Sequence, residues 1–152
     1  MIHEENTKIR IKLDKDLIFK SNFDFEKTKE IFIDETLDKS GKLIGPDAAS
    51  LIGMAITSCL SASFLFCLYK RNLSLDDLEA HADISFFQND KGYTRIRKID
   101  IKIVPKTEDP DVLKRIKQCI REMRSGDMYF EETCIITPSV KEGININVEV
   151  DI

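Results

Sequence analysis

Four cysteines carry most of the reactive chemistry that this sequence offers: Cys59, Cys67, Cys119 and Cys134. A cysteine thiolate attacks peroxides and disulfides, and two thiols together can cycle between the reduced and the disulfide form. No two of them have the close spacing typical of a zinc site, so no metal centre is expected. The residues alone leave two alternatives, a redox pair or four small buried apolar side chains, because free cysteine is commonly buried.

The charge balance excludes some partners. The 152 residues include 23 Lys and Arg against 27 Asp and Glu, a formal net charge of −4. A nucleic-acid-binding protein normally needs a concentrated basic surface to neutralise phosphates, so nucleic acid is not an expected partner. His81 falls on the polar side of an alternating segment, where solvation is more common than catalysis.

Cysteine usage and the first residues suggest a compartment. The cysteines are too few and too far apart for a disulfide-rich secreted scaffold, and residues 1–5 are acidic and lack the pattern of a signal peptide. We therefore expect a cytoplasmic protein with reduced thiols. The uncharged run 51–69 just reaches the length of a bilayer span. Its glycine, serine and threonine residues favour a buried central helix over a membrane span, so no membrane partner is expected.

The N-terminal third is expected to form three strands and the start of a helix. Alternation predicts a first strand around residues 9–13, a turn at 14–16, and an extended run from 17 that breaks at 21–22. Residues 30–34 are predicted to form a third strand. Gly45 and Pro46 mark a loop that opens a helix over about 46–71.

The remainder is expected to add a hairpin, a second helix and an extended end. Residues 78–86 and 99–103 alternate on either side of a turn at 89–92, which predicts two long antiparallel strands. A second helix is predicted from Asp109, its N-cap, and Pro110 to a stop at Ser125-Gly126. Short extended elements are predicted at 134–136 and 144–150. We expect one α+β domain over 1–152, and a homodimer, because the first helix is apolar on more than one side.

Two segments resemble the OsmC/Ohr family. The first, Gly45-Pro46-Asp47-Ala48-Ala49-Ser50-Leu51 followed by the helix that carries Cys59, is similar to the family's central helix with its cysteine near the middle. The second, Cys134-Ile135-Ile136-Thr137-Pro138-Ser139-Val140 followed by Gly143-Ile144, is similar to its second-cysteine motif. The likeness extends over about residues 9–152.

The resemblance implies a fold and an activity. The implied fold has antiparallel sheets packed around a long central helix in an intertwined homodimer. The implied activity is a thiol-dependent peroxidase that reduces organic hydroperoxides or hydrogen peroxide. By analogy, Cys59 attacks and becomes a sulfenic acid, and Cys134 resolves it as a disulfide that a dithiol such as dihydrolipoamide reduces. No cofactor and no metal are implied, and the role fits an oxidative stress response.

The sequence departs from the family around the attacking thiol. A thiol needs a nearby cation or helix N-terminus to ionise readily at neutral pH, and Cys59 lies well past the first helical turn. The family's peroxidases use an arginine from the N-terminal strands, held by a glutamate at the start of the central helix. Arg10 is the arginine that matches by resemblance, but the glutamate position holds Ser50. The lysines at 12, 15 and 20 and the arginines at 95 and 97 are alternatives.

Two other functions therefore stay open. The loss of the glutamate favours a noncatalytic OsmC-like module that binds a small apolar ligand or senses oxidants. The other alternative to a peroxidase is a structural dimer in which the four cysteines are inert. Cys67 and Cys119 are expected to be core residues, with Cys119 near Cys134 as an alternative placement.

Overall fold

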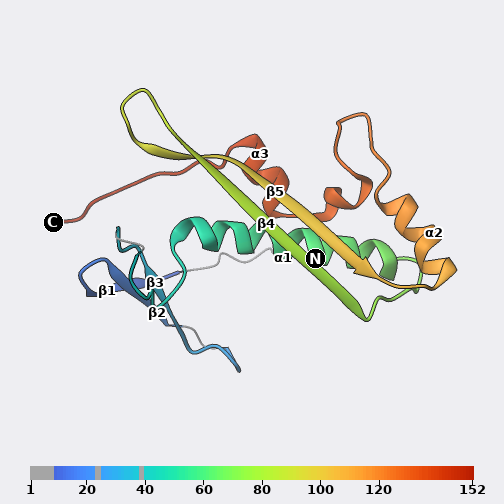
Figure 1. The fold of residues 1–152 in the computed structure, drawn as a ribbon, viewed down its shortest axis with the longest axis horizontal. Coiled ribbons are helices and arrows are strands. Elements are labelled where there is room, and N and C mark those ends of the chain that lie inside the picture. Colours follow the sequence, from blue (N-terminus) through green and yellow to red (C-terminus); the bar gives the residue numbers. More distant parts are fainter. Residues whose placement is uncertain (1–8, 23–24, 38–39) are drawn as a thin grey trace. The chain divides into compact units, whose positions relative to one another are not determined.

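The computed structural model describes residues 9–22, 25–37 and 40–152 (Figure 1). The first five residues, on which the signal-peptide argument depends, lie outside the described residues. The chain forms two compact units, Met1–Ile52 and Gly53–Ile152. The long helix α1 (Ala48–Tyr69) begins in the first unit and continues in the second. The expectation of one domain over 1–152 stays a prediction.

The first unit contains a three-stranded antiparallel sheet in the order β1-β2-β3. Its strands are β1 (Ile11–Lys15), β2 (Ile18–Asn22) and β3 (Glu30–Asp34). The tight turn between β1 and β2 places Asp16 at φ 49°, a left-handed conformation that Asp tolerates. The predicted break at Ser21-Asn22 is wrong. Ser21 is buried in β2, and its hydroxyl donates to the Arg10 carbonyl at 2.9 Å.

The loop before α1 is held by hydrogen bonds to three acidic side chains, those of Asp34, Glu35 and Asp47. The Asp34 carboxylate accepts the N–H groups of Thr36 and Ile44. Asp47 then accepts the Ser50 N–H at 2.8 Å, which caps the first turn of α1. Gly45 packs so closely against the Phe32 backbone that a Cβ atom would overlap it. The predicted helix, about 46–71, is confirmed to within two residues at each end.

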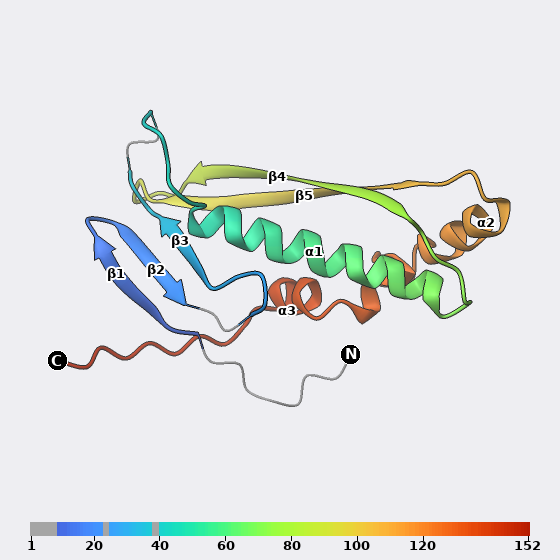
Figure 2. The ribbon, with the colours of Figure 1, turned by 90° about the horizontal axis from the view of Figure 1, so that it is seen from below.

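In the second unit, a long hairpin lies across α1 (Figures 1 and 2). It consists of β4 (Asp77–Gln88) and β5 (Thr94–Lys106), antiparallel and joined by a turn at 89–92, as predicted. The approach is close at Gly53, where an added Cβ would meet the Ile84 side chain. By length and composition α1 is able to span a membrane, but one face of it is buried within this unit.

The second helix begins as predicted and ends earlier. α2 (Pro110–Cys119) is capped by Asp109, whose carboxylate accepts the N–H groups of Asp111 and Val112. The predicted end at 125–126 is wrong. The chain leaves the helix after Cys119 and turns back on itself, with the Tyr129 N–H donating to the Arg121 carbonyl.

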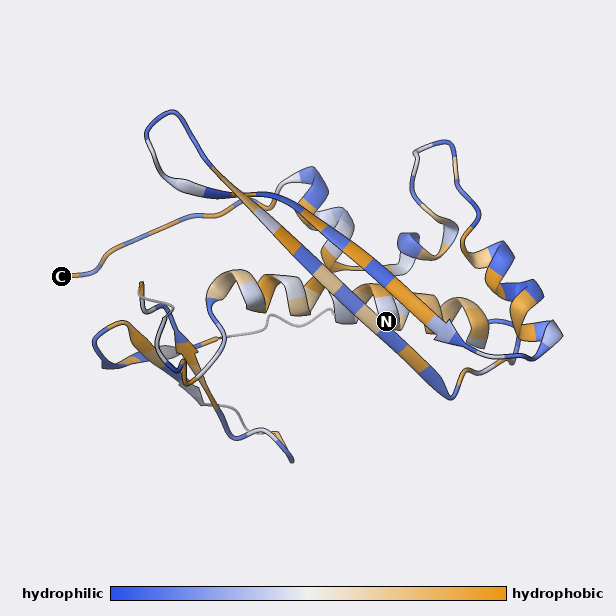
Figure 3. Cartoon of the chain, in the orientation of Figure 1, coloured by the Kyte–Doolittle hydropathy of each residue, from blue (hydrophilic) through white to orange (hydrophobic). Residues whose placement is uncertain are grey.

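The segment around Cys134 is helical, so the predicted strand at 134–136 is wrong. A 3-10 turn, η1 (Tyr129–Thr133), precedes Cys134, and α3 (Ile136–Glu142) follows it. Gly143, at φ 88°, then ends α3. Residues 144–152 run on extended and form no ladder with the described strands. Their apolar side chains alternate with polar ones (Figure 3) and are exposed, for example Ile146 at 78% and Val148 at 84%.

A disulfide joins α1 to α2 in the core of the second unit. Cys67 and Cys119 are 3% and 0% exposed, which confirms that both are core residues. Their sulfur atoms are bonded, so the expectation that both are free thiols is wrong. The alternative placement of Cys119 near Cys134 is wrong as well. A separation of 52 residues gave no indication of this partner, because only the folded chain brings the ends of α1 and α2 together.

Candidate active site

The two remaining cysteines lie against each other. Cys59 is half-buried in the middle of α1, and Cys134 is buried in the turn between η1 and α3. Their Sγ atoms are 3.1 Å apart although 75 residues separate them in sequence. A disulfide bond is about 2.05 Å long, so a movement of roughly 1 Å would bring the sulfurs to bonding distance. The pair of thiols is therefore placed for oxidation to a disulfide.

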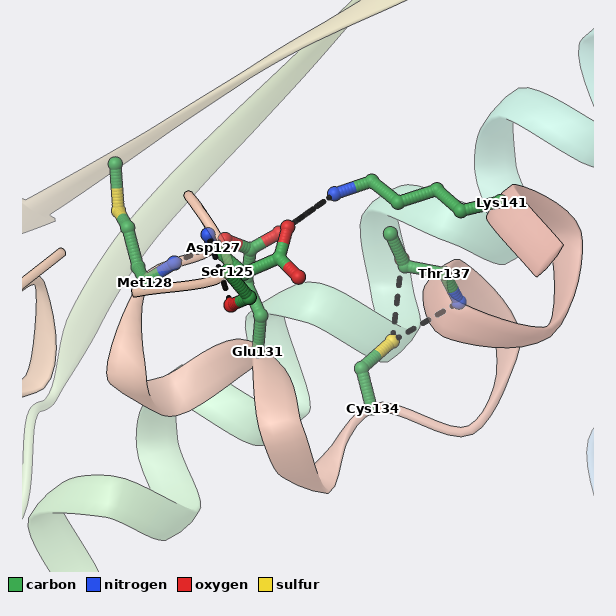
Figure 4. Close-up of polar contacts among 7 residues, drawn as sticks. All are labelled: Ser125, Asp127, Met128, Glu131, Cys134, Thr137 and Lys141. Atoms are coloured by element: carbon green, nitrogen blue, oxygen red, sulfur yellow. Dashed lines mark hydrogen bonds and ion pairs between the residues drawn. The ribbon is translucent and has the colours of Figure 1, made fainter. Parts of the chain in front are cut away.

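Thr137 makes two hydrogen bonds with the sulfur of Cys134 (Figure 4). The Thr137 hydroxyl is hydrogen-bonded to Cys134 Sγ at 3.2 Å, and the Thr137 N–H donates to the same sulfur at 3.4 Å. These contacts arise because α3 begins directly after Cys134. The first N–H groups of a helix have no partner within it, and here they face the two sulfurs.

The surroundings move the pKa values of the two thiols in opposite directions. Burial disfavours ionisation of Cys134, but hydrogen bonds from the Thr137 hydroxyl, from Cys59 and from backbone N–H groups outweigh it, so the pKa of Cys134 is lowered. For Cys59, burial and the hydrogen bond with Cys134 outweigh the N–H groups of Ile136 and Ile135, so its pKa is raised. When the pair loses a proton, these opposite shifts favour the negative charge on Cys134 over Cys59.

The groups that shift these pKa values most are neutral donors and the partner thiol. Arg10 belongs to the first unit, where its side chain is exposed and its carbonyl accepts the Ser21 hydroxyl. Its pairing with Cys59 stays a prediction. The two alternative arginines in the second unit each lie over an aromatic ring, Arg95 over Tyr93 and Arg97 over Phe87. Among the alternative lysines, Lys20 lies 3.9 Å from the Glu30 carboxylate.

An apolar cavity of about 660 Å³ is lined by residues that neighbour the thiol pair, although neither cysteine is part of the lining. It lies between α1, β5, α2, η1 and α3, and the residues that line it include Leu60, Phe64, Ile101, Ile116, Phe130 and Thr137. Leu60 follows Cys59 in the chain, and Thr137 contacts Cys134. Lys98, Glu131 and Lys141 add charge to the lining. This volume accommodates a small organic molecule with an apolar body.

Lys141 is already paired with acids. Its ammonium group lies 2.7 Å from Asp127 and 3.5 Å from Glu131 (Figure 4). Across residues 9–22, 25–37 and 40–152, no cluster of three His, Cys, Asp or Glu side chains is arranged to hold a metal ion. In the described part of this unit, the groups arranged for a reaction are therefore the thiols of Cys59 and Cys134.

Sequence reasoning missed Thr137. Its signal is the spacing Cys134-x-x-Thr137, which places two side chains on one face of a helical turn. That spacing carries no information in a strand, and the β-branched run Ile135-Ile136-Thr137 is more typical of a strand than of a helix. Thr137 contacts Cys134 because α3 begins as a helix directly after this cysteine, which the sequence pattern did not predict.

Known proteins resemble this chain in sequence pattern and in fold. A family model described as OsmC-like protein matches residues 38–149. Among solved structures, a candidate osmotic stress induced and detoxification response protein from Psychrobacter arcticus aligns with TM-score 0.64 and 16% identity, over 91% of each chain. An OsmC-like protein of unknown function from Vibrio cholerae gives 0.63 and 15%, over 90% of this chain and 94% of that one.

A third solved structure carries a functional name. The organic hydroperoxide resistance protein OhrB of Bacillus subtilis aligns with TM-score 0.59 and 11% identity, over 89% of this chain and 91% of that one. Among curated proteins, none matches the sequence. At these identities the solved structures establish a common fold, α+β with antiparallel sheets, as the sequence predicted.

Proposed function

Because the chain belongs to the OsmC-like family, we propose that it is a thiol-dependent peroxidase that reduces hydroperoxides with Cys59 and Cys134. The 3.1 Å separation of the two sulfurs is the observation that carries this proposal. A neighbour of the same fold is named for resistance to organic hydroperoxides, which agrees with it.

In the first step, the Cys59 sulfur attacks the terminal oxygen of the hydroperoxide. An S–O bond forms and the O–O bond breaks, so the sulfur is oxidised to a sulfenic acid while the peroxide is reduced to an alcohol, or to water for hydrogen peroxide. The leaving alkoxide takes up a proton. Cys59 is assigned as the attacking residue because its side chain is half-buried, whereas that of Cys134 is 4% exposed.

In the second step, Cys134 attacks the Cys59 sulfenic sulfur. The S–S bond forms, the S–OH bond breaks and hydroxide leaves as water. A dithiol such as dihydrolipoamide then reduces the disulfide and is itself oxidised, which restores both thiols. Rapid resolution protects Cys59 from further oxidation, because a sulfenic acid left in contact with peroxide proceeds to irreversible acids.

The cavity favours organic hydroperoxides over hydrogen peroxide. Its lining is mainly aliphatic and aromatic, and it includes Thr137, which contacts the Cys134 sulfur. An apolar peroxide bound there would release its hydration water and hold its O–O group near Cys59. Hydrogen peroxide has no apolar body and gains nothing from such a lining.

The active protein is proposed to be a homodimer. The support is the exposed apolar series in residues 144–152 and the exposed apolar side chains on α1, such as Met54 and Phe66. An extended segment with alternating apolar side chains is a strand that lacks a partner, and a second copy of the chain offers a matching partner. This arrangement agrees with the intertwined dimer that the family resemblance implies.

A coupled assay with cumene hydroperoxide and dihydrolipoamide tests the activity. We expect the wild type to consume both at steady state, Cys59→Ser to be inactive and Ser58→Ala to retain activity. Ser58 is a matched control because it neighbours Cys59, is exposed and donates its hydroxyl only to the helix carbonyl of Ala55. Full turnover by Cys59→Ser would refute the assignment.

The cavity also supports the second function, binding of a small apolar ligand without turnover. That function predicts saturable binding of an unreactive analogue, cumyl alcohol, with no loss of hydroperoxide. Peroxide consumption by the wild type rules it out as the main activity.

A further inference from the structure

α2 is linked to α1 through a single residue of the longer helix, Cys67. The Cys67 sulfur is bonded to Cys119, and the Cys67 carbonyl accepts the Nε–H of Arg115 at 3.0 Å. Cys67 belongs to the last turn of α1, and α2 lies beside that end of the helix (Figures 1 and 2). Among the described residues, the covalent and the hydrogen-bonded links between the two helices therefore meet at one point.

The chain around Cys119 also forms one wall of the apolar cavity. Ile116, which precedes Cys119 by one helical turn, and Ile120, which follows it directly, both line the cavity; we call these two side chains the α2 wall. On α1, Phe64 lines the cavity one turn before Cys67. Ile116 is buried, whereas Ile120 is 44% exposed and has little protein packed outside it. The position of this outer part of the wall therefore depends on the neighbouring Cys119.

We propose that the Cys67–Cys119 disulfide is a positioning element of the cavity, which holds the α2 wall in place against a bound apolar molecule. This inference rests on the proposed function, in which the apolar body of the hydroperoxide binds in the cavity. A wall that is already fixed loses little conformational freedom when the ligand binds, so more of the apolar contact energy appears as affinity. The bond thus acts on ligand binding as well as on the stability of the fold.

A dithiol reductant removes this bond and leaves the rest of the site unchanged. The S–S bond breaks, each of the two sulfurs gains one hydrogen, and the dithiol is oxidised to a disulfide. Cys59 and Cys134 are already free thiols, so the reductant changes one bond in the resting protein. Cys67 and Cys119 are 3% and 0% exposed, so the reductant reaches them only when α2 moves away from α1. After reduction, the Arg115 hydrogen bond is the remaining link at this point.

Calorimetric titration with cumyl alcohol, with no peroxide present, tests the inference. We compare the wild type before and after reduction with dithiothreitol, and peptide mapping establishes the state of each cysteine. Reduction should weaken binding about tenfold, the effect of losing the apolar contact of one aliphatic side chain. Amides of α2 should also exchange their hydrogens faster. A bond that only stabilises the fold would leave the Kd unchanged. An equal Kd in folded, reduced protein would therefore overturn the inference.

Two variants with the disulfide intact test the α2 wall without any reductant. Ile120→Ala should weaken cumyl alcohol binding about fivefold, because a lining side chain is shortened. Leu113→Ala is the matched control, since Leu113 is 42% exposed on the same helix and is not part of the lining. Reduction should also have a smaller effect in Ile120→Ala than in the wild type, because the two changes act on one contact. Equal affinities of the two variants would overturn the inference even if reduced protein did not stay folded.

Turnover of cumene hydroperoxide separates this inference from the peroxidase function. Binding that is unchanged by reduction, in a wild type that consumes the hydroperoxide, would refute the positioning role and leave the peroxidase function intact. Binding that weakens on reduction, in a wild type that consumes no hydroperoxide, would refute the peroxidase function and support the positioning role. Cys67→Ala, Cys119→Ala should bind with the same Kd in the presence and absence of the reductant, because it has no disulfide to lose.

Discussion

The Sγ atom of Cys59 lies 3.1 Å from that of Cys134, and the hydroxyl and N–H groups of Thr137 hold the second sulfur on its other sides. α1 supplies one thiol, and the turn before α3 supplies the other. The pair therefore depends on the packing of a segment near the C-terminus against the middle of the central helix.

The two thiols should affect each other's ionisation in opposite directions. Cys59→Ala removes an S–H donor from Cys134, so the pKa of Cys134 should rise by about one unit. Cys134→Ala removes a sulfur that keeps the proton on Cys59, so the pKa of Cys59 should fall. Both values are measured by thiolate absorbance, with the Cys59→Ala, Cys134→Ala double variant as the baseline. If the remaining thiol of each single variant had the same pKa as in the wild type, the two thiols would not influence each other's ionisation.

The Cys67–Cys119 disulfide should contribute to stability. Closing a loop of 52 residues is worth about 4 kcal/mol of unfolding free energy in the chain-entropy description. The free energy of unfolding of the wild type, measured in urea, should therefore fall by about that amount once a reductant has broken the disulfide. The unfolding of Cys67→Ala, Cys119→Ala should not respond to reductant. Equal stability of the wild type with and without reductant, with four free thiols in both samples, would contradict the disulfide.

Arg115 should stabilise the junction between α1 and α2. It is 8% exposed, and its Nε–H donates to the Cys67 carbonyl at 3.0 Å, one of the last carbonyls of α1. Arg115→Ala leaves that carbonyl without this donor and should cost about 1.5–3 kcal/mol in urea unfolding. Lys114→Ala, on the exposed neighbouring position, should change stability by less than about 0.5 kcal/mol. Equal costs for the two variants would contradict this role.

The alternation of apolar and polar side chains in residues 144–152 predicts which of these residues support a dimer. Ile146→Asp with Val148→Asp places charges on the apolar series and should shift the protein toward monomer in size-exclusion chromatography with light scattering. Asn145→Asp with Asn147→Asp adds the same charge on the polar series and should leave the dimer intact. Dissociation by both pairs to the same extent would point to net charge instead of strand pairing.

Much of the fold follows from local patterns in the sequence. Period-two alternation predicted β4 and β5, the apolar run 31–33 predicted β3, and Asp109 with Pro110 predicted the start of α2. These features depend on neighbours a few residues apart, so the sequence displays them directly. The end of α2 and the helix α3 were not predicted, because β-branched residues after Cys134 favour a strand locally and tertiary packing overrides that preference.

The site was predictable in part. The resemblance singled out Cys59 and Cys134, and the structure places their sulfurs together. The disulfide partner of Cys67 and the contact of Thr137 with Cys134 both depend on where helices end in space, which no local pattern encodes. Within the second unit, the groups that move the pKa of Cys59 are the backbone N–H groups of Ile136 and Ile135 and the thiol of Cys134.

The most direct test of the central claim is a reaction of the protein, its Cys67–Cys119 bond intact, with one equivalent of cumene hydroperoxide. Intact mass and peptide mapping are read together with the amount of cumyl alcohol formed. We predict a loss of two hydrogens, a new peptide cross-link between Cys59 and Cys134, and one equivalent of alcohol. Both thiols still free while the hydroperoxide remains unconsumed would contradict the account.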